Sequence, residues 1–201
     1  MSRSNLLRGL VTGLALAPAV AFAHTGMGDA HDFLHGFVHP IAGIDHVLAM
    51  VAVGGIAAQL GGRAIWAVPA SFMAMMAIAG ACGMTGIAIP FSEFGIALSL
   101  VVLGAMVVFN VRLPVVAASA LVALFAVAHG YAHGMEMPDN LSGVTFGAGF
   151  IIATALLHGI GVGLGSGVKR MGALGGQRLA QAFGGCVALV GLAGLVGGFA
   201  S

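Results

Sequence analysis

The sequence predicts an all-α integral membrane protein, a bundle of six transmembrane helices that follows a cleaved signal peptide. Of the 201 residues, 60% are hydrophobic and only 6% are charged, and the mean hydropathy is +1.10. A soluble domain carries about 25% charged residues, so this composition excludes an ordinary soluble fold. The net charge is +1, and the 7 Lys and Arg residues form no basic patch of the kind that binds nucleic acid.

Residues 1–23 have the three parts of a secretory signal peptide. Arg3 and Arg8 form a basic start, Gly9 to Ala17 an apolar core, and Ala21-Phe22-Ala23 a cleavage site of the A-x-A type. The alternative is an uncleaved first span, but an apolar stretch of about 15 residues is shorter than the roughly 20 that cross a bilayer. We therefore expect cleavage after residue 23.

Residues 24–39 would then form a periplasmic, histidine-rich amino-terminal segment. His24 would become the first residue, and a free amine beside an imidazole can chelate a metal. His31, His35 and His39 follow it closely. A solvated polar tail that binds no metal explains the same residues equally well, so both interpretations stay open.

Six apolar segments follow, and each is close to the length that a spanning helix needs. They cover about residues 40–60, 65–83, 93–109, 114–134, 143–164 and 179–199, within a transmembrane domain over residues 40–201. Breaks rich in Gly, Pro or charged residues separate them. Because lipid offers the backbone no hydrogen-bonding partner, we expect each segment to be a helix.

The charged residues orient this bundle. With the mature amino terminus outside, the loops that hold all five mature basic residues are cytoplasmic, as the positive-inside rule requires: Arg63, Arg112, Lys169, Arg170 and Arg178. Glu93 and Glu136 then lie at the outer surface. We therefore expect a multi-pass protein of the bacterial inner membrane whose mature amino terminus is periplasmic.

The segment HPIAGIDH, residues 39–46, places two imidazoles and a carboxylate at the start of the first span. An ionisable residue inside a membrane segment costs roughly 2.5–3.5 kcal/mol on insertion scales and therefore indicates a functional site. Asp45 and His46 would lie about 8–9 Å below the outer surface. If the helix extends back past Pro40, His39 and His46 share one face within about 20°.

A second polar group ends the fourth span. His129 and His133 are four residues apart and Glu136 follows three later, so one helical stripe holds all three. Imidazole together with carboxylate suits Ni²⁺, Co²⁺ or Zn²⁺. Residue 130 is Gly, so the pattern is not the HExxH of zinc proteases. With Glu93 at the start of the third span, we expect one outer metal site built from His39, Asp45, His46, Glu93, His129, His133 and Glu136.

Three further residue types have two interpretations each. His158 lies about 22 Å along the fifth span, where it is either a downstream ligand or a core residue hydrogen-bonded to a backbone carbonyl. The 11 Met residues could bind Cu(I), but they form no MxxxM series beside the histidines, so we interpret them as packing residues. Cys82 and Cys186 stand alone in apolar runs, and we expect them to be small buried hydrophobes.

The two histidine motifs together resemble those of the HupE/UreJ family of nickel and cobalt permeases. HPxxGxDH matches residues 39–46 and HGxxHGxE matches residues 129–136, both without substitution. The resemblance implies import of Ni²⁺ or Co²⁺ for metalloenzymes such as hydrogenase and urease, whose maturation machinery would be an indirect partner. It also implies functional importance for His39, Asp45, Phe72, Glu93, His133 and Glu136. For Phe72 the sequence by itself indicates only a packing aromatic.

We therefore expect a permease that carries Ni²⁺ (or Co²⁺) from periplasm to cytoplasm, with no permanently bound cofactor and no enzymatic activity. The alternative is a metal-dependent membrane hydrolase, which the absence of Ser from both motifs disfavours. A b-type haem protein is a third interpretation, and it would place acidic residues beside an apolar porphyrin at high cost. The choice among Ni, Co and Zn, the coupling ion and assembly into a homo-oligomer stay open at this stage.

Overall fold

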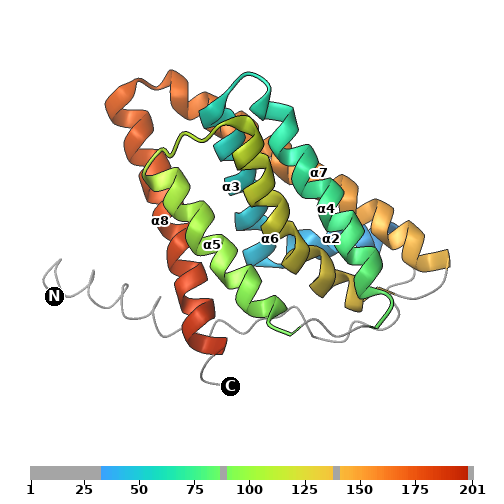
Figure 1. Cartoon of the computed structure of the whole chain (residues 1–201). Coiled ribbons are helices and arrows are strands. Elements are labelled where there is room, and N and C mark those ends of the chain that lie inside the picture. The colour runs from blue at the N-terminus through green and yellow to red at the C-terminus, as the bar shows by residue number, and fades with distance from the viewer. Residues whose placement is uncertain (1–32, 87–89, 138–140, 199–201) are drawn as a thin grey trace, which may run out of the picture.

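A computed structural model describes residues 33–86, 90–137 and 141–198, and nearly all of these residues are helical (Figure 1). The described part of the chain has seven helices: α2 (Phe33–Ala42), α3 (Ile44–Leu60), α4 (Ala64–Gly83), α5 (Ser92–Val108), α6 (Val115–Met135), α7 (Leu141–Arg170) and α8 (Ala173–Gly198). The all-α prediction is confirmed. The expected signal peptide, residues 1–23, and His24 and His31 lie outside the described residues.

Four of these helices, α4, α6, α7 and α8, are long and apolar enough to cross a membrane. The pair α2 and α3 together makes a fifth candidate span, although the two helices meet at an angle of 83°. Helix α5 is also apolar but shorter, with 17 residues. By length and composition, the described residues therefore hold four or five candidate spans, against the six expected.

The first expected span is broken at Gly43. Helix α2 continues through Pro40 to Ala42, and then the backbone of Gly43 is extended (φ −86°, ψ 113°) before α3 begins. An extended residue interrupts the i to i−4 hydrogen bonds, so the chain changes direction there. The prediction that His39 and His46 lie on one face of a continuous helix is therefore wrong. His39 belongs to α2 and His46 to α3.

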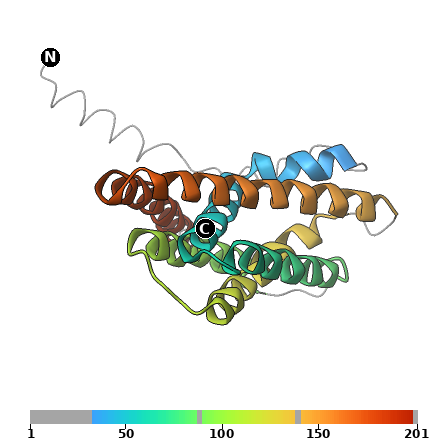
Figure 2. The same ribbon diagram turned by 90° about the horizontal axis from the view of Figure 1, so that it is seen from above.

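Small residues bring the helices together in close pairs: α4 with α6, α5 with α8, and both α2 and α3 with α7. A Cβ atom added to Gly130 would collide with the backbone oxygen of Met76, and one added to Gly54 with that of His158. Such contacts are typical of membrane helices, whose backbones approach closely where side chains are small. Seen from above, α7 lies along one side of the molecule with α2 beside it (Figure 2). The polar ends of α2, α3 and α6 consequently lie within reach of one another.

The two ends of the bundle differ in charge. Arg63, Arg112 and Lys169 lie where α3 meets α4, α5 meets α6 and α7 meets α8, all at the upper end in Figure 1. The Nζ atom of Lys169 donates a hydrogen bond to the backbone oxygen of Ala58, at 2.6 Å. Glu93 and Glu136 lie at the opposite end, where α5 begins and α6 ends.

Many large apolar side chains face outward, as expected of a protein surrounded by lipid. Trp66, Leu124 and Leu189 are each at least 65% exposed. Cys82 and Cys186 are exposed as well, so the prediction that they are buried is wrong. In a membrane protein an apolar face has no need to be buried against protein, which is why an apolar sequence context did not predict their burial.

Candidate metal centre

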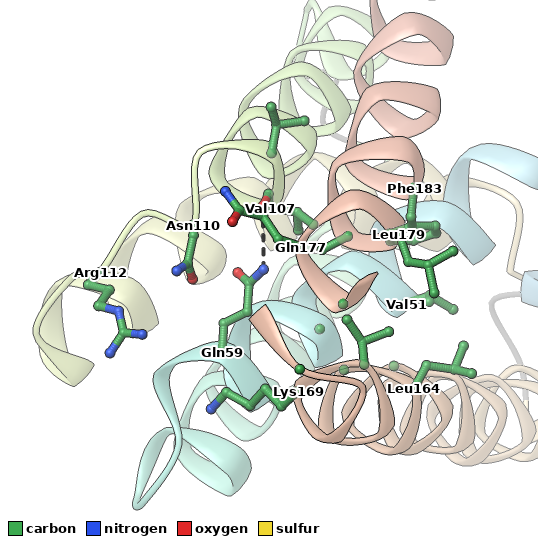
Figure 3. Close-up of a pocket in the computed structure, with 18 residues that line it drawn as sticks. Val51, Gln59, Val107, Asn110, Arg112, Leu164, Lys169, Gln177, Leu179 and Phe183 are labelled. Carbon is green, nitrogen blue, oxygen red and sulfur yellow. Dashed lines mark hydrogen bonds between the residues drawn. The ribbon is translucent and has the colours of Figure 1, made fainter. Parts of the chain in front are cut away.

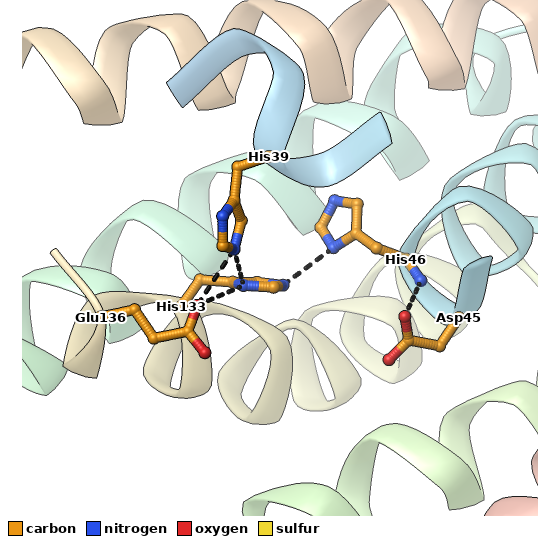
Figure 4. Close-up of polar contacts among 5 residues, drawn as sticks. All are labelled: His39, Asp45, His46, His133 and Glu136. Atoms are coloured by element: carbon orange, nitrogen blue, oxygen red, sulfur yellow. Dashed lines mark hydrogen bonds and ion pairs between the residues drawn. The ribbon is translucent and has the colours of Figure 1, made fainter. Parts of the chain in front are cut away.

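Three helices bring three imidazoles and one carboxylate together. His39 comes from the last turn of α2, His46 from the first turn of α3 and His133 from the last turn of α6, with Glu136 directly after that helix. In Figure 4 the ring of His133 lies between those of His39 and His46, and Glu136 lies on the side of His39. His133 thus contacts His46, which lies 87 positions earlier in the sequence, and His39, which lies 94 positions earlier.

His39, His133 and Glu136 form a part-exposed triangle, which we call the outer group. The Nε2 atom of His39 lies 3.0 Å from Oε2 of Glu136 and 3.2 Å from Nδ1 of His133, and that Nδ1 lies 3.7 Å from the same oxygen. Ligands held about 2.1 Å from a metal ion are about 3.0 Å apart in octahedral and about 3.4 Å apart in tetrahedral geometry. The triangle therefore has close to the size of one face of a metal coordination shell.

His46, His129 and His133 form a second triangle, which we call the inner group. The Nε2 atom of His133 lies 3.2 Å from Nδ1 of His46, while the Nδ1 atom of His133 faces the outer group. His46 and His129 are 1% and 0% exposed, so this group is nearly closed to solvent. His133 is a member of both groups and presents a different nitrogen to His39 and to His46.

Hydroxyl groups orient the rings of the inner group. The Oγ atom of Ser99 donates to the backbone oxygen of Ile96, at 2.6 Å, and lies 2.9 Å from Nε2 of His129. Because a hydroxyl has a single hydrogen, Nε2 of His129 must be the donor, and its Nδ1 carries the lone pair. That Nδ1 is buried and has no hydrogen-bond partner in the described part of the chain. Ser99 therefore holds His129 in the tautomer that leaves Nδ1 able to bind a metal.

The outer group carries the negative charge. Burial raises the pKa of the Glu136 carboxyl, but hydrogen bonding to His133 and His39 and the charges of both rings outweigh burial and lower the pKa to about 2. Glu136 is consequently ionised at neutral pH, and it attracts a cation to the outer group. The inner group consists of histidines alone, so a divalent ion there would be held by neutral nitrogen ligands.

Aromatic side chains of α7 enclose the two groups. The ring centroid of Phe150 lies 4.8 Å from that of His133 and 5.1 Å from that of His46, and Phe146 lies 5.5 Å from His39. Such rings exclude water and strengthen electrostatic interactions inside the site. Neither histidine motif indicates these two residues, nor does it indicate Ser99 or Thr154, whose Oγ1 lies 3.3 Å from Nε2 of His46. The sequence signal that could have indicated the residues of α7 is the spacing of four between Phe146, Phe150 and Thr154, which places them on one face of the helix.

Two predicted ligands lie outside both groups. Asp45 is adjacent to His46, but its Oδ1 accepts a hydrogen bond from the backbone N–H of His46, at 2.8 Å (Figure 4), and its carboxylate belongs to neither ligand group. This contact stabilises the first turn of α3, where an acidic side chain is favourable. Glu93 is exposed at the start of α5. The structure thus brings together five of the seven predicted residues: His39, His46, His129, His133 and Glu136.

The less strongly predicted site residues that the structure describes lie outside both groups. His35 is exposed on α2, whereas Phe72 and His158 are buried. The ring of Phe72 lies 5.7 Å from that of His129 and 5.5 Å from that of His158.

One pocket lies beside the outer group and another at the basic end of the bundle. A pocket of about 210 Å³ borders His133 and Phe150 between α4, α6 and α7. A larger one, of about 560 Å³, lies at the basic end between α3, α5, α7 and α8, where Gln59, Arg112 and Lys169 are among its lining residues (Figure 3). None of the predicted site residues that the structure describes lines this larger pocket.

Comparison with known proteins relates the whole arrangement to one family. The sequence matches the HupE / UreJ protein family over residues 12–194. It is also similar to Protein HupE of Rhizobium leguminosarum bv. viciae, with 46% identity over 187 residues that cover 93% of this chain and 95% of that protein. No solved structure matches the chain. The region matched includes both the outer and the inner group.

Proposed function

This chain belongs to the HupE / UreJ protein family, and we propose that it is a permease that carries Ni²⁺ (or Co²⁺) from the periplasm to the cytoplasm. The observation that carries the proposal is the position of His133 between two ligand groups that differ in exposure and in charge. A resident metal stays at one site, whereas a transported ion must enter one site and leave for another.

The proposal assigns successive roles to the two groups. Glu136, ionised at neutral pH, attracts the hydrated cation, and His39 and His133 replace part of its water. Asp45 and Glu93 add negative potential near the same end of the bundle without acting as ligands. The ion then moves to the buried His46 and His129 and to the other nitrogen of His133, whose proton is transferred to the nitrogen that the ion has left. A divalent ion moving inward gains about 2 × 2.3 kcal/mol per 100 mV of membrane potential, so ATP is not required.

The proposed topology has a cleaved signal peptide over residues 1–23, a periplasmic segment over residues 24–39 and six spans within residues 40–201. In this topology the last residues of α2 and all of α3 form the first span, the rest of α2 belongs to the periplasmic segment, and α5 forms the third span. The separation of basic from acidic helix ends supports it, because positive charges collect on the cytoplasmic side of the inner membrane. A helix broken beside an ion site is a recurrent feature of transporters.

A metal-dependent hydrolase receives less support from the same residues. Metal-assisted hydrolysis needs a coordination position that substrate and water can reach. His46 and His129 are almost completely buried, and aromatic rings cover the outer group from the side of α7. By the family resemblance, the imported metal would serve hydrogenase or urease maturation, so those proteins would be indirect partners.

Metal uptake by bacteria that lack their own nickel importers tests this function. Expression of the chain should raise the accumulation of radioactive Ni²⁺, and excess Co²⁺ or Zn²⁺ should reduce it. Mg²⁺ should not compete, because it prefers oxygen ligands and retains its water. His133→Ala should abolish the gain, whereas Met135→Ala, an exposed position two residues away on α6, should retain it. Accumulation no higher than in cells without the protein would overturn the proposal.

A further inference from the structure

We propose that His158 is a third metal ligand, which receives the ion from the inner group along the buried ring of Phe72. This inference rests on the proposed transport function and adds one binding position to the path of the ion. The sequence left His158 with two interpretations, a downstream ligand or a residue hydrogen-bonded to a backbone carbonyl. Three structural observations favour the first.

The first observation concerns the hydrogen bonding of His158. The side chain is 2% exposed, and neither Nδ1 nor Nε2 has a hydrogen-bond partner in the described part of the chain. A neutral imidazole has one donor and one acceptor, and burying both without partners is unfavourable. The hydrogen bond to a backbone carbonyl, which would explain a structural role, is therefore not present. Two unengaged nitrogens leave the ring able to coordinate a metal with either one.

The second observation is the position of His158 on α7. Phe146, Phe150, Thr154 and His158 are spaced four residues apart, so they form one stripe along the helix with about 6 Å between neighbours. All four are at most 2% exposed. The first three contact histidines of the outer and inner groups. His158 occupies the next turn of the same stripe, in the direction of the basic end of the bundle.

The third observation is the ring of Phe72, which contacts both sides of the proposed transfer. Its centroid lies 5.7 Å from that of His129 and 5.5 Å from that of His158, and the side chain is fully buried. An ion that moves from His129 to His158 would therefore move along this ring. The face of an aromatic ring attracts a cation but offers no lone pair, so the ring can be crossed without becoming a binding site itself.

Weak binding of the ion at His158 would favour its release. Among the described residues, neither group of convergent His and acidic side chains includes His158, so a single imidazole would be the side-chain ligand there. One nitrogen holds Ni²⁺ or Co²⁺ less firmly than three do. The ion would accordingly descend from a site with a carboxylate and two imidazoles, through one with three imidazoles, to one with a single imidazole.

A cobalt titration of a cysteine variant tests whether metal reaches this position. His158→Cys is made in a chain in which Cys82 and Cys186 are replaced by Ser, and the purified protein is titrated with Co²⁺. A thiolate bound to Co²⁺ gives an intense charge-transfer absorption in the near ultraviolet, and thiolate is a strong ligand for such metals. The matched control is Ala153→Cys, which is 1% exposed on the same helix.

We expect the thiolate band in the His158→Cys protein and not in the Ala153→Cys protein. The inference is overturned if Co²⁺ shows its imidazole-bound spectrum in both proteins and neither has a thiolate band. It is equally overturned if both cysteines give bands of similar intensity, since the position would then have no special access to the ion.

A second variant separates this inference from the proposed function. His158→Leu removes both nitrogens from a buried position and leaves the outer and inner groups intact. Equilibrium binding of Ni²⁺ should stay within about twofold of wild type, while the initial rate of uptake into vesicles falls by at least about tenfold. Wild-type uptake by His158→Leu would overturn the role of His158 alone. Failure of the wild-type protein to bind and transport Ni²⁺ would overturn the proposed function and this inference together.

Discussion

The Nε2 atom of His133 lies 3.2 Å from the Nδ1 atom of His46, although 87 residues separate them in the sequence. The other nitrogen of the same ring lies 3.2 Å from Nε2 of His39. One imidazole therefore joins a part-exposed group that contains a carboxylate to a buried group that contains only histidines. This arrangement makes His133 the residue on which both groups depend.

Replacing His133 by Ala should weaken Ni²⁺ binding by more than about 100-fold, because outer-shell partners alone change metal affinity by 10–100-fold and His133 is a ligand in both groups. His39→Ala should have a smaller effect, since the inner group remains complete. Isothermal titration calorimetry of the purified proteins measures both affinities. Equal losses in the two variants would contradict the shared role of His133.

Ser99→Ala should lower metal affinity by about 10–100-fold, although Ser99 is not itself a ligand. The substitution removes the hydroxyl that lies 2.9 Å from Nε2 of His129 and fixes the tautomer of that ring. Ser71→Ala is the matched control, because the Ser71 hydroxyl donates to the backbone oxygen of Ala67 in its own helix. The same calorimetric titration compares them, and similar affinities in the two variants would exclude an orienting role for Ser99.

Gly54→Ala should destabilise the protein by about 1–3 kcal/mol, because the added methyl group overpacks a close helix contact. Its Cβ would collide with the backbone of His158 and lie 2.8 Å from the backbone nitrogen of Val162, both on α7. Gly55→Ala, at the adjacent position, meets no atom within 4 Å and should be neutral or slightly stabilising. Denaturant unfolding in detergent distinguishes them. An equal loss at both positions would indicate a general effect on helix α3 instead.

Uptake should fall as the external pH decreases through about 6.5, because an imidazole must be neutral to bind metal and an unperturbed histidine titrates near that value. Glu136 does not contribute to this change. Its pKa is lowered to about 2, so the carboxylate keeps its charge throughout the range from pH 5 to 8. Radioactive Ni²⁺ uptake at constant membrane potential measures the profile. A flat profile over this range would mean that histidine nitrogens do not bind the transported ion.

Asp45→Asn should preserve folding and equilibrium metal binding but slow uptake several-fold. The Asn side-chain oxygen can still accept the hydrogen bond from the backbone N–H of His46, whereas the negative charge near the entrance is lost. Uptake rates measured at low and high ionic strength separate the two roles, because screening weakens only the contribution of the charge. Loss of equilibrium Ni²⁺ binding in this variant would instead make Asp45 a direct ligand.

Much of the helical structure could be predicted from the sequence. A chain with so few charged residues has to satisfy its backbone hydrogen bonds within helices, and the polar and glycine-rich breaks mark where these end. The relationship among His129, His133 and Glu136 was also predictable, because a spacing of four and three residues is local to one helix. The bend at Gly43 could not be predicted in this way. It accompanies close contacts between α2 and α7, of Gly36 with Phe146 and of Gly149 with Phe33.

The sequence by itself determined which residue types are available to a metal and at which end of the bundle most of them lie. Only the tertiary structure decided that His46 and not Asp45 turns towards His133, that Glu93 remains exposed, and that His158 continues a stripe on α7. The physical reason is helix rotation. Which face of each helix points inward is determined by close backbone contacts between different helices, such as that of Gly54 with His158. Those contacts depend on both partners, and neither motif specifies them alone.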